Sequence, residues 1–517
     1  MQLIGTLSSN GDDERAVLVQ QHDKESTVPI VTRFSFRKLW AFTGPGLLMS
    51  IGFLDPGNVT SDLQTGTSVK YELLWVLLGA TVVGLILQRL SARLGVVTRL
   101  HLAELCFTHY KRPANFFLWI MVEIALIASD VQYKLSIAVA IFSLSKTLIP
   151  LWAGVLITTV DLLIFLYFDQ HGLRRLEFFF GMLILVMAVT FGYEFVKSRP
   201  NFFEILEGVV IPRCRNCTAD ALLQQVSIVG SNVMPHNLFL HSALVKSRNV
   251  NSLNHADVSE ANFYFFVESG LAVALSFLIN MFIMTVFGDE VHDKTNHDIR
   301  VQCAGFSNSS MFNHYNIAAP DLYAAGLSLG CIFGVSAMFI WFIGILASAQ
   351  SATMTVTYAG QYIVEGFFNW HWKAWQRTLF CKALSIVPTI LFAFYYDTKT
   401  LTSICNILNT LISIQLPFAM LPTIAFSSNP RIMKDFTNGR IVTAVSLLLA
   451  LAIIVSNVFF VFRSIVNMSW YVQIPIAAVG GVYVILYSYL VLHVLVACDA
   501  IKSKICGHLF DLLEENS

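Results

Sequence analysis

Charged residues are scarce in this sequence. Only 13% of its 517 residues are Asp, Glu, Lys or Arg, whereas a soluble domain carries about 25%. Hydrophobic residues make up 56% of the chain, and the mean hydropathy is +0.65. The formal net charge is zero, so no basic excess indicates nucleic-acid binding. This composition predicts a polytopic membrane protein and argues against a series of soluble domains.

Several common motifs are missing as well. The first 36 residues are polar and mixed in charge, without the apolar core of a secretory signal. The nine cysteines form no repeated CxxC pairs of the zinc-ribbon type, and C-R-N-C at 214–217 stands alone. No nucleophile–base or phosphate-cradling motif stands out, so we do not expect an enzyme or a bound cofactor.

Long apolar runs fill most of the chain. A run of about 18 residues or more can cross a bilayer as a helix. We count about twelve such runs, at 40–66, 72–94, 115–144, 150–168, 176–196, 221–246, 262–287, 320–363, 378–396, 401–426, 441–462 and 471–498. The sequence therefore predicts an all-α membrane protein of about twelve transmembrane helices.

The basic residues in short loops predict the orientation of these helices. With the N-terminus in the cytosol, the cytosolic connections contain Arg93, Arg99, Lys111, Arg112, Arg174, Arg175, Lys246, Arg248, Lys373, Arg377, Arg431, Lys434 and Arg440. The loop at 197–215 is an exception, because it is basic and lies outside. The glycosylation sequons at Asn216, Asn308 and Asn467 all fall outside, which agrees with this topology. Both termini are then cytosolic. We expect the protein in a plasma membrane or in an endosomal or lysosomal membrane.

Three cysteines also lie on the predicted outer side. Cys214, Cys217 and Cys303 would face an oxidising compartment, where a disulfide among them can form. Their pairing does not follow from the sequence.

Two apolar runs contain turn-forming residues near their middle. The stretch "SIGFLDPGNVTSDL" at 50–63 includes Asp55-Pro56-Gly57-Asn58, and a later run includes Met234-Pro235-His236-Asn237. The two runs are five helices apart, so each would begin a five-helix unit. Discontinuous helices at matching positions are typical of transporters built from inverted repeats, whose binding site lies near the membrane midplane.

These breaks suggest a division of the chain. We expect a disordered cytosolic tail at 1–36, a first inverted repeat at 37–200, an extracytosolic loop at 201–220, a second repeat at 221–430 with a glycosylated loop at 288–319, two further helices at 431–500 and a cytosolic tail at 501–517.

The residues at the breaks have the chemistry of metal ligands. Asp55 offers an anionic oxygen, Asn58 a neutral oxygen and Met234 a soft sulfur, while the breaks free carbonyls such as those of Gly52 and Ser231. A thioether favours softer ions than Mg²⁺ or Ca²⁺. Simple proline kinks and core packing of the methionine are the competing explanations. An intramembrane acid at one of two matched breaks favours a metal site.

Four longer strings carry a family resemblance. They are "LWAFTGPGLLMSIGFLDPGN", "MPHNLFLHSALVKSR", "QSATMTVTYAGQYIVEGFF" and "SIQLPFAMLP". Over residues 35–500 the chain resembles the NRAMP family of divalent metal transporters, and most closely its animal members. The resemblance implies a LeuT-like fold of 5+5 inverted repeats and proton-coupled import of Fe²⁺ or Mn²⁺ toward the cytosol. Cd²⁺ and Co²⁺ are further substrates in the family.

The resemblance also assigns residues to the metal site. Asp55, Asn58 and Met234 match the family's side-chain ligands, and Gly52 and Ser231 match its backbone-carbonyl ligands. Asn409 occupies the position that lines the site in the inward-closed state.

Buried ionisable residues are candidates for a proton route. Glu123 and Asp130 lie on one face of the run at 115–144, and acids inside a membrane are functional candidates by default. His236 and His241 follow the second break, and histidine titrates near physiological pH. A structural role for His241 remains an alternative. In the family, acids and histidines at these positions belong to the proton route and its gating.

The chain departs from the family pattern beside this route. Family members have Asp-x-x-Glu followed by an apolar pair and Gly, whereas this chain has Asp130, Tyr133, Lys134 and Ser136. The usual arginine is Lys382, which keeps the charge but loses the planar fork. Further departures are Ser231, Asn232, Ala349 and Val356.

These departures make proton coupling an open question. A tyrosine does not carry a proton as a carboxylate does. Lys134 could pair with Asp130 or Glu123, or extend outward. We therefore expect metal transport with altered proton coupling. A milder alternative is that Ser231 and Asn232 broaden the selectivity toward harder ions.

Two other functions compete with transport of metal ions. A metal sensor without transport would need an output domain, and we expect none, because only a short tail follows residue 500. An amino-acid transporter would need a helix N-terminus free for a carboxylate, which Asp55 would repel. We expect divalent metal ions, protons and the lipid bilayer as partners, no nucleic acid, and a monomer as sufficient.

Overall fold

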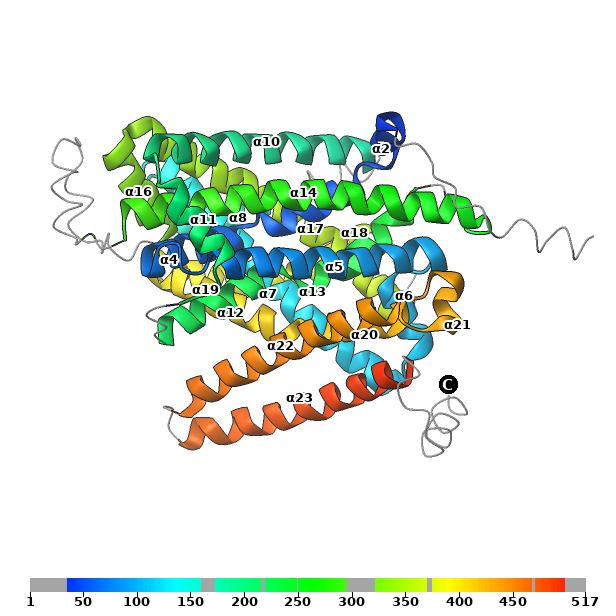
Figure 1. Cartoon of the computed structure of the whole chain (residues 1–517). Coiled ribbons are helices and arrows are strands. Elements are labelled where there is room, and N and C mark those ends of the chain that lie inside the picture. Colours follow the sequence, from blue (N-terminus) through cyan, green and yellow to red (C-terminus); the bar gives the residue numbers. More distant parts are fainter. Residues whose placement is uncertain are drawn as a thin grey trace, which may run out of the picture.

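The helices of this protein form a single bundle with two broken members near its centre (Figure 1). The computed structural model describes residues 35–159, 173–214, 219–248, 250–292, 294, 321–369, 374–466 and 470–497. Every regular element in these ranges is a helix.

The first half of the chain contains α2 (Phe36–Phe42), α3 (Pro45–Ser50), η1 (Ile51–Phe53), α4 (Pro56–Val69), α5 (Leu74–Thr98), α6 (Leu102–His109), α7 (Arg112–Leu144), α8 (Leu151–Ile157), α10 (Leu173–Ser198) and α11 (Phe202–Val210). The second half contains α12 (Ala219–Asn232), α13 (Pro235–Val245), α14 (His255–Glu290), α16 (Leu322–Phe333), α17 (Val335–Phe368), α18 (Ala374–Tyr395), α19 (Thr398–Gln415), α20 (Pro417–Ser427), α21 (Pro430–Met433), η4 (Lys434–Phe436), α22 (Arg440–Val466) and α23 (Trp470–Ala497).

Most of the predicted apolar runs correspond to these helices, while residues 160–168 of the run at 150–168 lie outside the described ranges. Within the described ranges, 8 helices are long and apolar enough to cross a membrane. The runs at 40–66 and 221–246 are split into α3–α4 and α12–α13 at the predicted breaks. The run at 320–363 is also split, which the sequence analysis did not predict. Gly334 separates α16 from α17 there with a φ of 99°, a conformation that glycine adopts without strain.

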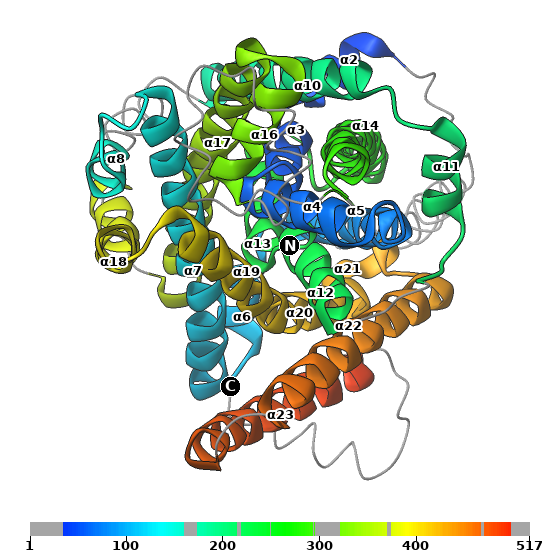
Figure 2. The same ribbon diagram turned by 90° about the vertical axis from the view of Figure 1, so that its left-hand side faces the viewer.

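The broken helices lie in the interior of the bundle. α4 packs against α12 and α14, and α13 packs against α5 and α17, while α7 contacts α17 and α19. Viewed from one end, α22 and α23 lie at one side of the bundle, apart from α4 and α13 (Figure 2). Polar side chains at the breaks are therefore enclosed by other helices.

Glycines let these helices approach closely. A Cβ on Gly66 would collide with the Met284 carbonyl of α14, and a Cβ on Gly230 would collide with the Asn409 carbonyl of α19. Backbone contacts of this kind fix the distance between the helices that surround the breaks.

Candidate metal site and its neighbouring ion cluster

The first break is held by a helix cap. Asp55 is the N-cap of α4, and its carboxylate accepts a hydrogen bond of 2.8 Å from the backbone N–H of Asn58. Pro56 occupies the first turn, where its missing N–H costs nothing. The local sequence therefore ends one half-helix and starts the next with the Asp55 side chain at the junction.

The second break has a similar form. α12 ends at Asn232 and α13 begins at Pro235, with Met234 in an extended conformation at the N-cap. Met234 is buried, as are Asp55 and Asn58. Both breaks therefore place the predicted ligands inside the protein, away from lipid.

The amide of Asn58 joins the two breaks. Its Nδ2 donates to the Gly52 carbonyl at 3.2 Å, to Asp55 Oδ1 at 2.9 Å and to the Ser231 carbonyl at 3.1 Å. Asn58 Oδ1 has no hydrogen-bond partner. Three oxygens thus converge on one nitrogen, and turning the amide over would add a fourth oxygen to the group. Such a set of oxygens suits a divalent cation.

Further oxygens surround Gly57. A Cβ at this glycine would lie 2.9 Å from Asn409 Oδ1, 3.0 Å from Gln132 Oε1 and 3.1 Å from Asp55 Oδ1. Asn409 Nδ2 donates to the Gly57 carbonyl at 3.2 Å, while the oxygens of Asn409 and Gln132 have no hydrogen-bond partner. The sequence analysis included Asn409 and missed Gln132, whose only signal was an uncharged amide within an apolar run.

Tyr133 lies directly at the site. Its hydroxyl donates to Asp55 Oδ2 at 2.5 Å and contacts Met234 Sδ at 3.2 Å. The sequence analysis had put Tyr133 in a polar network beside the site. The structure instead shows its hydroxyl between an oxygen ligand candidate of one break and the sulfur of the other.

Three amide side chains meet in the half of α4 that leads to the predicted outer loops. Gln64 Oε1 of α4 accepts from Gln224 Nε2 of α12 at 3.3 Å and from the Asn406 amide of α19. Asp62, also on α4, is fully buried, and neither of its oxygens has a hydrogen-bond partner. The sequence analysis missed all four residues, although Asp62 is an acid inside an apolar run.

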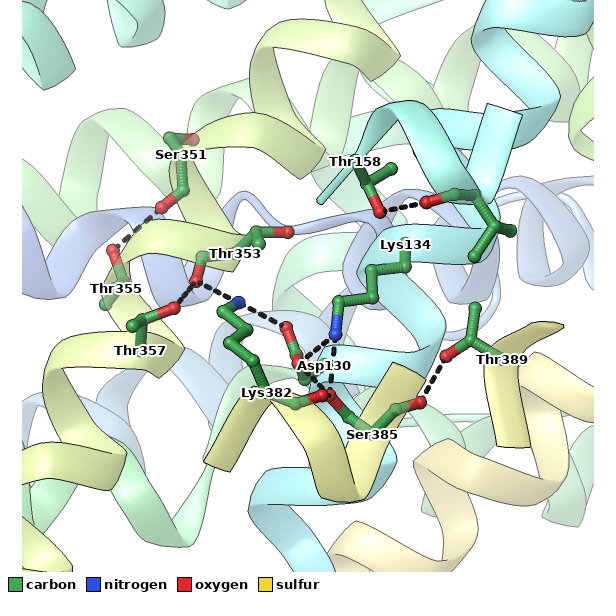
Figure 3. A network of polar contacts seen from close by, with 11 residues as sticks. Asp130, Lys134, Thr158, Ser351, Thr353, Thr355, Thr357, Lys382, Ser385 and Thr389 are labelled. Atoms are coloured by element: carbon green, nitrogen blue, oxygen red, sulfur yellow. Dashed lines mark hydrogen bonds and ion pairs between the residues drawn. The ribbon is translucent and has the colours of Figure 1, made fainter. Parts of the chain in front are cut away.

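A second polar centre lies between α7, α17 and α18 (Figure 3). Lys134 Nζ is 2.7 Å from Asp130 Oδ2 and 2.6 Å from Ser385 Oγ. Lys382 Nζ of α18 is 2.9 Å from Asp130 Oδ1 and 3.3 Å from the Thr353 carbonyl of α17. The Ser385 hydroxyl also donates to Asp130. Lys134 therefore pairs with Asp130, not with Glu123 and not with water at the surface. We call Asp130, Lys134, Lys382 and Ser385 the Asp130 cluster.

A family model described as "Natural resistance-associated macrophage protein-like" matches residues 46–463. This chain belongs to the NRAMP family.

NRAMP proteins of animals are similar over most of the chain. Protein Malvolio of Drosophila melanogaster is 51% identical over 477 residues, which cover 90% of this chain and 80% of that protein. Natural resistance-associated macrophage protein 2 of Homo sapiens is 46% identical over 490 residues, covering 93% and 86%. NRAMP-like transporter smf-1 of Caenorhabditis elegans is 43% identical, covering 99% and 93%.

Solved structures have the same fold. A crystal structure of the Eremococcus coleocola manganese transporter matches with a TM-score of 0.76 and 25% identity, covering 91% of this chain and 98% of that one. MHP1, a nucleobase-cation-symport-1 family transporter, matches with a TM-score of 0.52 and 13% identity, covering 81% and 90%. The predicted all-α membrane fold of LeuT type is confirmed.

The remaining predicted residues of this NRAMP protein lie around the two centres. Glu123 is buried on α7, and no ion pair that the structure describes includes it. His236 and His241 are buried on α13. The Ser136 hydroxyl donates to the Gln132 carbonyl within α7 at 3.0 Å. Their roles in a proton route or gate stay predictions.

Several predictions concern residues outside the described ranges. These are the cytosolic tails apart from residues 35 and 36, most of the loop at 288–319, the sequons at Asn216, Asn308 and Asn467, and the cysteines Cys217 and Cys303. Cys214 and Cys331 are both disulfide-bonded. The sequence analysis did not consider Cys331, and a disulfide among Cys214, Cys217 and Cys303 stays a prediction.

Proposed function

We propose that this NRAMP protein transports divalent transition-metal ions across a membrane toward the cytosol. The observation that carries the proposal is the meeting of the two broken helices around Asn58, whose amide contacts Asp55 and the carbonyls of Gly52 and Ser231. These oxygens come from both halves of the chain. A cation bound among them would contact both halves, so its binding can be coupled to movement of one half relative to the other.

The sulfur of Met234 narrows the class of substrate. Met234 Sδ lies within 3.2 Å of the same tyrosine hydroxyl that is 2.5 Å from Asp55. A thioether adds affinity for softer divalent ions and little for Mg²⁺ or Ca²⁺. We therefore propose Fe²⁺ and Mn²⁺, with Cd²⁺ and Co²⁺ as further substrates. The manganese transporter of the same fold supports this assignment.

The structure gives no support for selectivity toward harder ions. The Ser231 hydroxyl donates to the Ile228 carbonyl at 3.2 Å, and the Asn232 amide donates to the same carbonyl at 2.9 Å. Both side chains thus bond back to their own helix. Transport of transition metals remains the better proposal, with a plasma membrane or an endosomal or lysosomal membrane as its location.

Methionine substitution tests the proposal. Uptake of Mn²⁺, Fe²⁺, Cd²⁺, Ca²⁺ and Mg²⁺ into proteoliposomes would be measured at several pH values for the parent and for Met234→Ala. If the sulfur is a ligand, Met234→Ala depresses Cd²⁺ uptake much more than any uptake of Ca²⁺ or Mg²⁺.

A matched control separates ligation from packing. Met420 of α20 is as buried as Met234 and belongs to the hydrophobic core. Met420→Ala removes the same side chain from a site without ligands, so it should reduce uptake of all ions equally. The same equal loss for Met234→Ala would contradict the ligand role.

A further inference from the structure

The two oxygens of the Asp55 carboxylate have different neighbours. Oδ2 accepts the hydrogen bond from the Tyr133 hydroxyl at 2.5 Å, and this hydroxyl also contacts Met234 Sδ. Oδ1 lies 3.1 Å from the position that a Cβ of Gly57 would occupy. One carboxylate oxygen is thus connected to the sulfur through the tyrosine, whereas the other belongs to the group of oxygens around Gly57.

Three oxygens surround one point beside Gly57. The position of an ideal Cβ at this glycine is 2.9 Å from Asn409 Oδ1, 3.0 Å from Gln132 Oε1 and 3.1 Å from Asp55 Oδ1. The three side chains belong to α19, α7 and the N-cap of α4. Metal–oxygen bonds are about 2.0–2.6 Å long. The three oxygens would therefore have to move by less than about 1 Å to bind one cation beside this point.

The amide of Gln132 is oriented with its oxygen toward this point. Its Nε2 donates to the Cys405 carbonyl of α19 at 3.4 Å. Turning the amide over would bring two oxygens together at that contact, because a carbonyl only accepts hydrogen bonds. Asn409 is oriented in a similar way, since its Nδ2 donates to the Gly57 carbonyl at 3.2 Å and to Ser227 Oγ at 3.3 Å. Both amides therefore present an oxygen at this point.

These amide oxygens are buried acceptors without a donor. Gln132 and Asn409 are both fully buried, and within the described part of the chain neither Gln132 Oε1 nor Asn409 Oδ1 accepts a hydrogen bond. A buried acceptor without a partner costs about 1–3 kcal/mol. A divalent cation would give both oxygens a partner next to an existing carboxylate. Their unpaired state therefore favours a ligand role for Gln132 over a role in packing alone.

We propose that Gln132 is a further oxygen ligand of the transported metal ion, and that its amide oxygen favours harder transition-metal ions over Cd²⁺. Amide and carboxylate oxygens suit Mn²⁺, whereas the thioether of Met234 suits softer ions. The site then has a harder side with Gln132 and Asn409 and a softer side with Met234, and Asp55 contributes one oxygen to each. This inference rests on the proposed function, because it names a ligand that sets the selectivity of the same site.

Removal of the amide tests this selectivity in proteoliposomes. Initial uptake rates over a range of Mn²⁺ and Cd²⁺ concentrations would be measured for the full chain and for Gln132→Leu, which has a side chain of similar size. Loss of the oxygen should raise KM for Mn²⁺ by at least about tenfold, as for other groups that support metal binding. It should raise KM for Cd²⁺ by about threefold or less. Met234→Ala should shift the ratio of the two KM values in the opposite direction.

Gln132→Glu distinguishes a ligand from a structural amide. This variant keeps an oxygen at the same side-chain length but removes the donor to the Cys405 carbonyl. If Gln132 is a ligand, Gln132→Glu should bind Mn²⁺ in calorimetry within about threefold of the parent, or more tightly, because it adds a charged oxygen. If Gln132→Leu does not yield folded protein, Gln132→Asn withdraws the oxygen by one methylene and replaces it in the comparison.

Gln415 of α19 provides a matched control. It is fully buried, and its Oε1 has no hydrogen-bond partner in the described structure. Its Nε2 donates to the Tyr483 hydroxyl of α23 at 2.5 Å, and α23 lies at one side of the bundle (Figure 2). Gln415→Leu therefore removes the same amide from a contact outside the metal site, and it should leave the ratio of KM for Mn²⁺ and Cd²⁺ unchanged.

The outcomes separate this inference from the proposed function. Absence of metal uptake by the folded parent would contradict transport itself, and calorimetry would still show whether Gln132 binds Mn²⁺. Uptake by the parent with an unchanged KM for Mn²⁺ in Gln132→Leu, or with equal changes for Mn²⁺ and Cd²⁺, would overturn only the ligand role of Gln132. Binding of Mn²⁺ to Gln132→Glu as weak as to Gln132→Leu would also overturn it, because the amide would then only hold α7 against α19.

Discussion

Two neighbouring polar centres share the helix α7 and differ in charge. At the metal site, Asp55 is surrounded by neutral donors from Asn58 and Tyr133, and no ammonium contacts it in the described structure. In the Asp130 cluster, one carboxylate is shared by Lys134 and Lys382. An acid with only neutral partners retains its attraction for a cation, whereas an acid between two lysines is already neutralised. Two consecutive residues of α7 belong to different centres: Tyr133 contacts Asp55 at the metal site, and Lys134 pairs with Asp130.

The largest effect is expected at the metal site. Asp55→Ala removes the only charged ligand candidate among the residues at the two breaks, so metal uptake should fall by more than about 100-fold, beyond the usual cost of losing a mere supporting residue of a metal site. Binding of Mn²⁺ measured by calorimetry should be lost together with uptake. Uptake within about tenfold of the parent would show that Asp55 is not a ligand.

Substitutions in the Asp130 cluster should lower the thermal stability of the protein. Asp130→Asn removes the carboxylate that two buried ammonium groups share, and breaking a buried ion pair from one side costs about 3–5 kcal/mol in comparable cases. Thermal unfolding in detergent should shift markedly downward. Ser385→Ala removes one neutral hydroxyl from the same cluster and should shift it much less. Equal shifts for the two variants would contradict the charge balance described here.

Tyr133→Phe tests whether the tyrosine hydroxyl weakens metal binding at Asp55. The phenol hydrogen competes with a metal ion for Asp55 Oδ2 and lies beside the Met234 sulfur. Removing a hydrogen bond of about 0.5–1.5 kcal/mol should lower KM for Mn²⁺ by about twofold to tenfold. Weaker binding in Tyr133→Phe would mean that the hydroxyl instead helps to hold the ligands in place. Initial uptake rates over a range of metal concentrations distinguish these results.

The smallest effect is expected at a third buried polar group, on the side that the sequence predicts to be cytosolic. His101 caps α6, its Nε2 lies 3.5 Å from Glu104, and Glu104 pairs with Lys246 at 2.7 Å. Burial lowers the pKa of His101 to about 4. Although burial favours the neutral acid, hydrogen bonds from the Lys246 ammonium and the His101 backbone help to lower the pKa of Glu104.

The sign of the pH dependence follows from the pKa of His101. The unfolded chain takes up a proton at this histidine below about pH 6.5, whereas the folded protein does so only near pH 4. The stability contributed by neutral His101 is therefore full above about pH 6.5 and falls toward pH 4, by at most about 1.4 kcal/mol per pH unit. In the variant His101→Asn, the free energy of unfolding should depend less on pH between about 6.5 and 4. An unchanged slope would show that His101 is not the group responsible.

Local sequence was enough to predict the two breaks. Proline at a first helical turn, with a capping Asp55 before Pro56, dictates where α4 begins whatever surrounds it. The apolar length of the other runs similarly required helices, because backbone groups in lipid must bond within their own segment. The same logic failed at Gly334, since a single glycine inside an apolar run does not specify whether the helix continues.

What the sequence by itself determined is the class of the protein, its broken helices and the residue types at the metal site, because these follow from hydropathy, proline and short-range capping. Only the tertiary structure decided which side chains meet. In the structure the Tyr133 hydroxyl contacts Asp55 and Met234. Gln132 lies beside Gly57, and Lys134 forms an ion pair with Asp130. Such contacts depend on how α7 is rotated and packed against α4, α13 and α18, and neighbours on a helix one residue apart can face different partners.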